Sequence, residues 1–170
     1  MKIRVLGSAA GGGFPQWNCN CNNCAGLRNG TLRAQARTQS SLAVAGSTDT
    51  SWVLINASPD ITDQLKANPV LQPGRAIRDC AIEAIVLVDG QIDHTTGLYM
   101  LRESVRPWPL WCTDSVYADL TRGNPVLQVL AHYCGIDRRR IDPGGEGFTI
   151  DAVPNVRWRA LLYGDRKSVV

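Results

Sequence analysis

An apolar run in the middle of this chain leads directly into a polar segment. The run is Ala84-Ile85-Val86-Leu87-Val88, and the segment is Asp89-Gly90-Gln91-Ile92-Asp93-His94. A short, continuous apolar run of this kind is typical of a strand that is buried on both faces. Open α/β sheets place their chemistry at the carboxyl ends of such strands. The sequence therefore predicts an α/β fold in which this strand delivers polar side chains to a functional site.

The polar side chains of the segment suit a metal site. Asp89 and Gln91 occupy alternate positions, whereas Asp93 and His94 are adjacent and converge on one ion only if the chain turns there. Gly90 and the helix-forming sequence that follows indicate such a turn. Taken alone, the segment is equally compatible with Asp93 as the cap of the next helix and His94 as a loop histidine with satisfied hydrogen bonds.

The spacing of the segment resembles the His-x-His-x-Asp-His signature of the metallo-β-lactamase superfamily. Asp89 and Gln91 stand where the signature has its first two histidines. Zinc hydrolases of the superfamily use imidazole-rich pairs of sites to hold and deprotonate water. Replacing two imidazoles by Asp89 and Gln91 removes most of the ligands of one metal site and leaves a harder site that is rich in oxygen ligands. The resemblance therefore implies an altered metal site, and a single histidine with carboxylates suits Fe(II).

A second candidate metal site is the cluster of Cys19, Cys21 and Cys24. Three thiolates within six residues suit zinc, which structural sites hold with four nitrogen or sulfur ligands. We therefore expect a fourth ligand from elsewhere in the protein. The glycine-rich segment 7–13 before the cluster lacks the ending of a P-loop and opens no helix. We interpret it as a tight backbone path near a site.

Composition and charge exclude several classes of protein. The chain has 170 residues, of which 44% are hydrophobic, enough for one domain with a substantial core. Its net charge of +3 is too small to indicate a nucleic-acid partner. We interpret the basic run Arg138–Arg140 as a solvated face where a helix passes into a loop. No apolar stretch reaches about 18 residues, and the first residues do not resemble a signal peptide. We therefore expect no signal sequence and a cytoplasmic protein that does not bind membranes.

Periodicity and turn residues predict hairpins first and strand–helix units afterwards. Strands are expected over residues 2–6, 41–45, 52–56, 83–88, 109–112, 148–150 and 156–162. Helices are expected over residues 59–66, 95–102, 114–120 and 124–134. Ser58 and Asn124 are the expected N-caps of the first and last helix, and His132 is expected in the core. Three further cysteines are expected to be small buried side chains: Cys80, Cys112 and Cys134.

The end of the chain carries an unusual sequence. Its last six residues, Asp165 to Val170, are those encoded by GATCGGAAGAGCGTCGTG, which is a common sequencing-adapter read. We therefore expect a truncated reading frame, with part of one domain at residues 1–164 and a non-native tail at residues 165–170. A natural basic terminus is the alternative.

Four segments together resemble the coenzyme PQQ synthesis protein B family. They are Leu6 to Cys24, Arg37-Thr38-Gln39-Ser40-Ser41, Asn56-Ala57-Ser58-Pro59-Asp60 and Gln91-Ile92-Asp93-His94-Thr95-Thr96-Gly97-Leu98. The resemblance extends to about Leu162 and covers roughly the first half of a family member. It implies an αββα sandwich of the metallo-β-lactamase type, of which this chain holds about the amino-terminal half. It also implies a role in making pyrroloquinoline quinone (PQQ).

The family resemblance further implies a reaction and roles for the acidic segment. PQQ is built from a Glu and a Tyr of a ribosomal peptide, and the family is regarded as an iron-dependent oxygenase that hydroxylates the tyrosine ring of the excised Glu–Tyr intermediate. Asp93 and His94 would then be iron ligands, and Asp89 either a ligand or the base that orients the imidazole. Gln91 would be a polar contact near the metal or the substrate.

Two further sets of residues are candidates for the substrate site. Asn56, Ser58 and Asp60 follow a predicted strand at the same edge of the sheet as the acidic segment. Ser58 and Asp60 are also interpretable as helix caps. The second set lines the substrate mouth or positions the cysteine loop: Gln16, Trp17 and Asn18.

Two other functions are compatible with the same residues. One is a carrier involved in transport of PQQ or its precursor to the periplasm, and the other is a metal-dependent hydrolase or phosphodiesterase of the same fold. The expected partners are a small molecule, PQQ or a precursor of it, and other proteins of the PQQ pathway. We expect the 170-residue chain on its own to be inactive and to expose an unpaired sheet edge.

Overall fold

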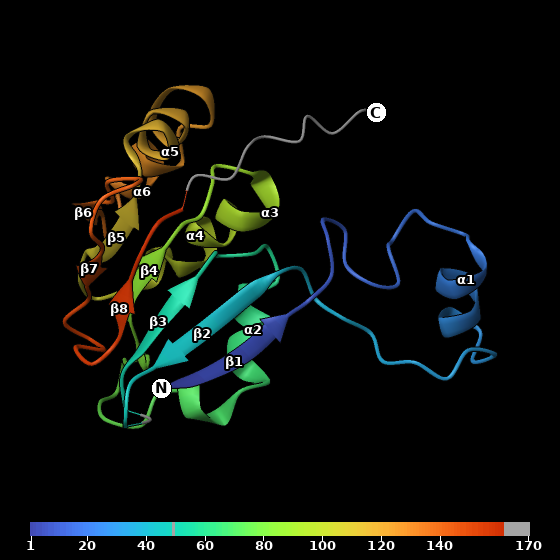
Figure 1. Ribbon diagram of the computed structural model, residues 1–170. Helices are drawn as coiled ribbons and strands as arrows, with labels where there is room; N and C mark the ends of the chain where they lie inside the picture. Colours follow the sequence, from blue (N-terminus) through green and yellow to red (C-terminus); the bar gives the residue numbers. More distant parts are fainter. Residues whose placement is uncertain (49, 162–170) are drawn as a thin grey trace.

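A six-stranded mixed sheet forms the centre of the computed structural model, which describes residues 1–48 and 50–161 (Figure 1). The strands lie in chain order as β1 (Lys2–Gly7), β2 (Ser41–Ala45), β3 (Trp52–Ile55), β4 (Ile82–Val86), β5 (Trp108–Cys112) and β6 (Ile136–Arg140). The first three strands are antiparallel, and β3 to β6 are parallel. This confirms the expected order of hairpins followed by strand–helix units.

Helices cover one face of the sheet. They include α2 (Ile61–Lys66), α4 (Gly97–Met100) and α6 (Val126–Leu130). A row of fully buried side chains crosses four strands at one register and packs in the cluster under these helices: Ala43, Leu54, Ile85 and Leu110. Burying each of the larger side chains contributes about 1.5–3 kcal/mol. The row accounts for the apolar residues on this face of β3 and β4.

A short antiparallel ribbon packs on the opposite face. It consists of β7 (Phe148–Thr149) and β8 (Arg157–Trp158), and it covers Val53, Ala84 and Val86. Phe148 stacks on Trp111 of the large sheet with ring centroids 4.7 Å apart, and Trp158 stacks on Phe148 at 6.5 Å. The ribbon gives the central sheet a second apolar layer, as an αββα sandwich requires.

The remaining elements connect the sheet or extend from it. They are α1 (Asn22–Arg28), α3 (Ile92–Thr95), α5 (Asp114–Ala118), the 3₁₀ turns η1 (Pro69–Leu71) and η2 (Leu101–Glu103), and the π-helical turn η3 (Asp119–Gly123). Thr113 caps α5, since its side chain accepts a hydrogen bond from the backbone N–H of Val116. In Figure 1 α1 and the loops beside it project away from the sheet.

Two helices are shorter than the sequence predicts. The expected helix over 95–102 is divided into the end of α3, α4 and η2. The expected helix over 124–134 is regular only in α6, and no side chain caps it, so Asn124 is not its N-cap. His132 lies exposed in the turn after α6, which makes the expected core histidine wrong.

The basic run is also placed differently. Arg138–Arg140 belongs to β6, which pairs with β5 on one side only, so the predicted helix-to-loop face is wrong. The side chains are solvated because they sit on an edge strand: the Arg138 guanidinium stacks over the Tyr117 ring at 3.8 Å, and Arg140 Nε pairs with Asp114 Oδ2 at 2.9 Å. Charged side chains on an edge strand also protect it from pairing with other chains.

The dispersed cysteines are not all buried. Cys112 is fully buried, whereas Cys80 and Cys134 are partly exposed. Burial raises the pKa of all three thiols. No helix in the described residues is long and apolar enough to cross a membrane. The predicted tail at residues 165–170 and the end of the predicted strand 156–162 lie outside the described residues.

Candidate metal centre

The residues singled out from the sequence gather at one edge of the sheet. β1, β3 and β4 end at this edge, and β2 begins there because it is antiparallel to its neighbours. The glycine-rich segment follows β1, Asn56 follows β3, and the acidic segment from Asp89 to His94 follows β4. In Figure 1 α3 lies beyond the tips of β3 and β4. The predicted convergence of these segments is therefore present.

Two carboxylates flank the imidazole of His94. Its Nδ1 lies 2.7 Å from Oδ1 of Asp89, and its Nε2 lies 3.8 Å from Oδ2 of Asp93. The His94 side chain is 17% exposed, against 36% for Asp89 and 22% for Asp93. A carboxylate on Nδ1 selects the tautomer in which Nε2 carries a free lone pair. His94 Nε2 and Asp93 Oδ2 could therefore share one metal ion, because two metal–ligand bonds of about 2.1 Å can span their separation.

The chain turns where the sequence predicts a turn. The Oδ1 atom of Asp89 also accepts a hydrogen bond from the backbone N–H of Gln91 at 3.0 Å, and α3 begins at the next residue. Asp93 lies inside α3 and does not cap it, which removes the capping alternative for that residue. The Gln91 side chain is exposed, and within the described residues no hydrogen bond to it is found.

The loop after β3 is clamped to the acidic segment. Asn56 has a left-handed backbone, with φ of 59°, and its Oδ1 accepts a hydrogen bond from the Val88 N–H at 3.2 Å. The Ala57 N–H donates to the His94 carbonyl, and the Ala57 carbonyl accepts from the Gly97 N–H, both at 2.8 Å. These bonds fix the position of His94 relative to the end of β3.

Ser58 and Asp60 behave differently from one another. Ser58 does not cap α2, and its buried Oγ has no hydrogen-bond partner among residues 1–48 and 50–161. Asp60 immediately precedes α2, but its side chain makes no capping bond. Instead, its Oδ2 accepts from the backbone N–H and the side-chain Nε2 of Gln39, at 2.8 and 3.1 Å. The structure therefore contradicts both capping interpretations, and the substrate-contact roles stay predictions.

The cysteine cluster forms a compact set of ligands at the start of α1. The sulfurs of Cys19, Cys21 and Cys24 all lie within 4.8 Å of one another. Hydrogen bonds from the Cys24 backbone and then from the Cys19 side chain lower the pKa of the Cys21 thiol to about 7. A thiolate is the form that binds a metal ion. The cluster could therefore hold zinc with three sulfur ligands.

The residues before the cluster stabilise its loop. Arg28 donates to the Gln16 carbonyl at 3.1 Å and also to the Cys19 carbonyl. The Gln16 Nε2 group donates to Asn18 Oδ1 at 3.0 Å. Trp17 is 82% exposed. Gln16 and Asn18 thus bond within the cysteine loop, which agrees with the alternative that they position it.

A cleft of about 920 Å³ opens at the same edge of the sheet. Asp89 and Gln91 line it from the acidic segment, and the stacked rings of Phe148 and Trp158 line it from the ribbon. Nothing in the sequence pattern connects these aromatic residues with the acidic segment, because β7 and β8 are too short for a strong pattern. Their aromatic character in two neighbouring short strands is the signal that could have indicated them.

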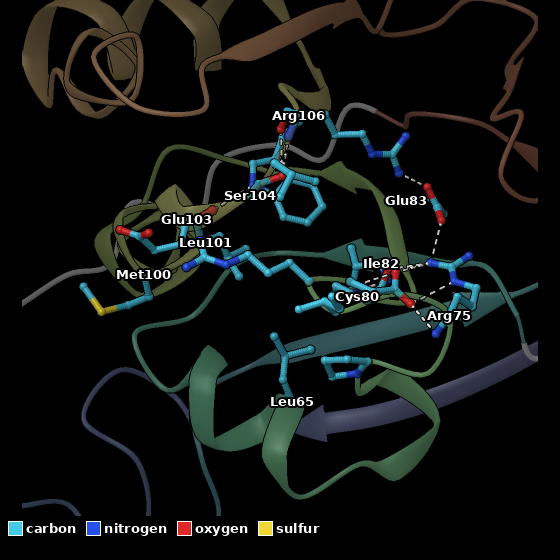
Figure 2. Close-up of a pocket in the computed structure, with 16 residues that line it drawn as sticks. Leu65, Arg75, Cys80, Ile82, Glu83, Met100, Leu101, Glu103, Ser104 and Arg106 are labelled. Atoms are coloured by element: carbon cyan, nitrogen blue, oxygen red, sulfur yellow. Dashed lines mark hydrogen bonds and ion pairs between the residues drawn. The ribbon is translucent and has the colours of Figure 1, made fainter.

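A second cavity of about 690 Å³ lies at the opposite ends of the parallel strands (Figure 2). Leu65, Ile82 and Leu101 form part of its apolar wall. At its rim Glu83 lies between two guanidiniums, with Oε1 3.0 Å from Arg75 and Oε2 paired with Arg106. None of the residues predicted for the metal sites lines this cavity, so the chemistry of the acidic segment is confined to the other edge.

Comparison with known proteins identifies the class to which this architecture belongs. Residues 51–163 match the family model of the beta-lactamase superfamily domain. The chain belongs to the β-lactamase superfamily, and the expected α/β fold of the metallo-β-lactamase type is confirmed.

Within that superfamily the chain is similar to coenzyme PQQ synthesis protein B. The protein of that name from Azoarcus sp. (strain BH72) is 65% identical over 161 residues, which are 95% of this chain and 52% of the relative. The one from Pseudomonas syringae pv. tomato is 58% identical over 159 residues, which are 93% of this chain and 52% of the relative. The chain spans about half the length of the curated relatives it matches.

Two solved structures are also similar to this chain. The Zn(2+)-bound PqqB from Methylobacterium extorquens has 41% identity and a TM-score of 0.78, covering 89% of this chain and 48% of that one. A diphosphatase from the PhnP family has 23% identity and a TM-score of 0.61, covering 82% of this chain and 50% of that one. The second likeness concerns the fold alone.

Proposed function

We propose that this chain carries the metal-binding edge of a PQQ biosynthesis protein that uses Fe(II) to hydroxylate the tyrosine ring of a Glu–Tyr-derived precursor. The observation that carries the proposal is the donor set around His94. One imidazole lies between two carboxylates, and Asp89 and Gln91 occupy the positions where the superfamily signature has histidines. The similarity to proteins named coenzyme PQQ synthesis protein B supports the pathway.

The donor set fits a single iron better than a pair of zinc ions. We assign Asp93 Oδ2 and His94 Nε2 as ligands, and Asp89 as the base that orients the imidazole through Nδ1. Non-haem iron oxygenases need such a histidine–carboxylate face with further positions open for dioxygen and substrate. Bound iron supplies the activation of dioxygen. The chain's own contribution is to fix the tautomer of His94 and to hold the carboxylate of Asp93 beside it.

The cysteine cluster has a separate role in the proposal. We assign Cys19, Cys21 and Cys24 to a structural zinc site, which the lowered pKa of the Cys21 thiol favours. The relative from Methylobacterium extorquens is zinc-bound, in agreement with this assignment. The cluster lies in the extension that contains α1, so zinc there would fix the loop rather than take part in the reaction.

The cleft beside Asp89 is the proposed substrate site. Gln91 lines it, and no hydrogen bond to its side-chain amide is found within the described residues. Asn56 and Asp60, in contrast, already accept hydrogen bonds from Val88 and Gln39. Gln91 is therefore the first polar contact we assign to the substrate. We propose that the reaction takes place in the cytoplasm, with PQQ precursors passed on by other proteins of the pathway.

A chimaera tests the function while keeping the length of a relative. The part of this chain that matches the Azoarcus protein over 161 residues replaces the corresponding part of that protein. With Fe(II), a reductant and a Glu–Tyr substrate, the chimaera should consume oxygen and hydroxylate the ring. Asp93→Ala should abolish both, whereas Asp63→Ala, an exposed carboxylate in an ion pair with Lys66, should change neither. Tight binding of PQQ without oxygen uptake would favour a carrier, and cleavage of a phosphodiester with zinc would favour a hydrolase.

A further inference from the structure

We infer that Gln39 is a positioning residue that holds the glycine-rich segment against the carboxylate of Asp93. The inference rests on the proposed function, because Asp93 is a proposed ligand. Gly11 is the point of contact between the two: a Cβ placed on Gly11 would lie 3.5 Å from Oδ2 of Asp93. The backbone of the glycine-rich segment therefore passes close beside the carboxylate of Asp93.

Gln39 connects that segment to the rest of the site. Its Oε1 accepts the N–H of Gly12 at 3.2 Å, and its Nε2 donates to Oδ2 of Asp60 at 3.1 Å. The backbone N–H of Gln39 donates to the same oxygen at 2.8 Å. The Gln39 side chain thus accepts a hydrogen bond from the glycine segment and donates one to the loop after β3.

The loop after β3 in turn holds the other side of the site. Asp60 lies three residues beyond Ala57, whose N–H donates to the carbonyl of His94 at 2.8 Å. The Asp93 side chain therefore lies between its own helix, α3, and the backbone of Gly11. The loop after β3 bonds to α3 directly and to the glycine segment through Gln39. Releasing the bond between Gln39 and Gly12 removes the side-chain hold on the glycine segment beside Asp93 without touching a proposed ligand, while the backbone bonds of the segment to residues 37 and 38 remain.

The position of Gln39 is itself well determined. Its carbonyl accepts from Gln64 Nε2 at 2.8 Å, and the same Nε2 donates to Thr38 Oγ1 at 3.0 Å. The Thr38 carbonyl accepts from the N–H groups of Ser8 and Ala9 at 3.0 and 2.9 Å. The backbone of residues 38 and 39 is thus tied to α2 and to the start of the glycine segment. Removing the Gln39 side chain leaves these bonds in place and tests the amide alone.

The experiment compares Gln39→Ala with a matched control, Gln72→Ala. Gln72 is an exposed glutamine whose amide, among residues 1–48 and 50–161, bonds only the Lys66 carbonyl. Three quantities are measured. Hydrogen exchange of the Gly12 amide and the ¹³C shift of the Asp93 carboxylate are followed in the 170-residue chain, and the affinity for Fe(II) is measured in the chimaera with zinc in the cysteine cluster. Gln39→Ala should speed Gly12 exchange, shift the Asp93 resonance and weaken Fe(II) binding by about tenfold, the size of effect typical of groups that orient metal ligands. Gln72→Ala should leave all three unchanged.

A rescue variant separates positioning from general loosening. Gln39→Glu combined with Asp60→Asn exchanges donor and acceptor between the two side chains. The oxygen of the introduced amide accepts from the backbone N–H of residue 39, and its nitrogen donates to the introduced carboxylate, which also accepts from Gly12. This double variant should restore Fe(II) affinity to within about threefold of the unchanged chimaera, whereas Gln39→Glu alone, with two carboxylates facing each other, should not. If Gln39→Ala does not fold, Gln39→Met removes the same hydrogen bonds at similar side-chain volume.

The outcomes for the two proposals are distinct. Unchanged Gly12 exchange and an unchanged Asp93 resonance in Gln39→Ala overturn the positioning role, whatever the chimaera binds. Fe(II) affinity within threefold of the unchanged chimaera overturns it as well. An unchanged chimaera that binds no Fe(II) overturns the proposed function, and the exchange and resonance measurements then decide the role of Gln39 by themselves.

Discussion

Gly97 is a position at which the site has no room for a side chain. A Cβ placed there would lie 2.2 Å from the Ser58 carbonyl oxygen and 2.6 Å from the Ala57 carbonyl oxygen. Both obstacles are backbone atoms, so the clash cannot be relieved by a change of rotamer. Gly97→Ala should therefore push α4 and the end of α3 away from the loop after β3.

The magnitude follows from the contacts that the shift disrupts. Overpacking costs about 1–3 kcal/mol. The hydrogen bonds from Gly97 N–H to the Ala57 carbonyl and from Ala57 N–H to the His94 carbonyl are both 2.8 Å long, and each contributes about 0.5–1.5 kcal/mol. We expect a loss of about 3 kcal/mol in the free energy of unfolding. For a chain of this size that lowers the melting temperature by roughly 6–12 °C.

Urea denaturation followed by circular dichroism measures this loss. Gly123→Ala is the matched control, because no heavy atom lies within 4 Å of the position of its Cβ. That control should stay within about 1 kcal/mol of the unchanged chain. A Gly97→Ala chain as stable as the control would refute the close approach between α4 and the loop after β3, and with it the clamp on His94.

Two further predictions concern ionisable groups. In the metal-free chain, the rate at which iodoacetamide alkylates Cys21 should rise with pH, with a midpoint near pH 7, because its neighbours lower the pKa of this thiol to about 7. Cys112 is buried and its pKa is raised, so it should stay unreactive at this pH. Equal alkylation rates for the two cysteines would contradict this prediction. Hydrogen bonding to Arg75 holds the pKa of Asp79 well below its usual range, so its stabilising effect is complete above about pH 4 and is lost as the pH falls. Asp79→Asn should accordingly lower the melting temperature at pH 7, and the difference should narrow below pH 4; a difference that does not change with pH would exclude the ion pair as its cause.

The strands that carry the site could be predicted because they are buried. β3 and β4 are continuous apolar runs, and the polar residues directly after them mark the functional edge. The turn at Asp89 was predictable from Gly90 and the adjacent ligand-type residues. These are local signals, which a sequence displays without knowledge of the contacts between distant segments.

The parts that were missed depend on distant neighbours. β6 has no apolar pattern, because Arg138 and Arg140 face solvent on an edge strand. Gln39 looks like any polar residue before a strand until β1 and the loop after β3 are brought beside it. His132 was misplaced because α6 ends two residues before it, a boundary that packing rather than helix propensity decides.

The metal content of the chimaera tests the central claim most directly. Purified under anaerobic conditions and equilibrated with Fe(II) and zinc, it should hold one iron and one zinc per chain, with Asp93→Ala losing the iron alone and Cys21→Ser losing the zinc alone. Two zinc ions bound at the acidic segment, both lost in Asp93→Ala, would contradict a single iron site and indicate hydrolase chemistry instead.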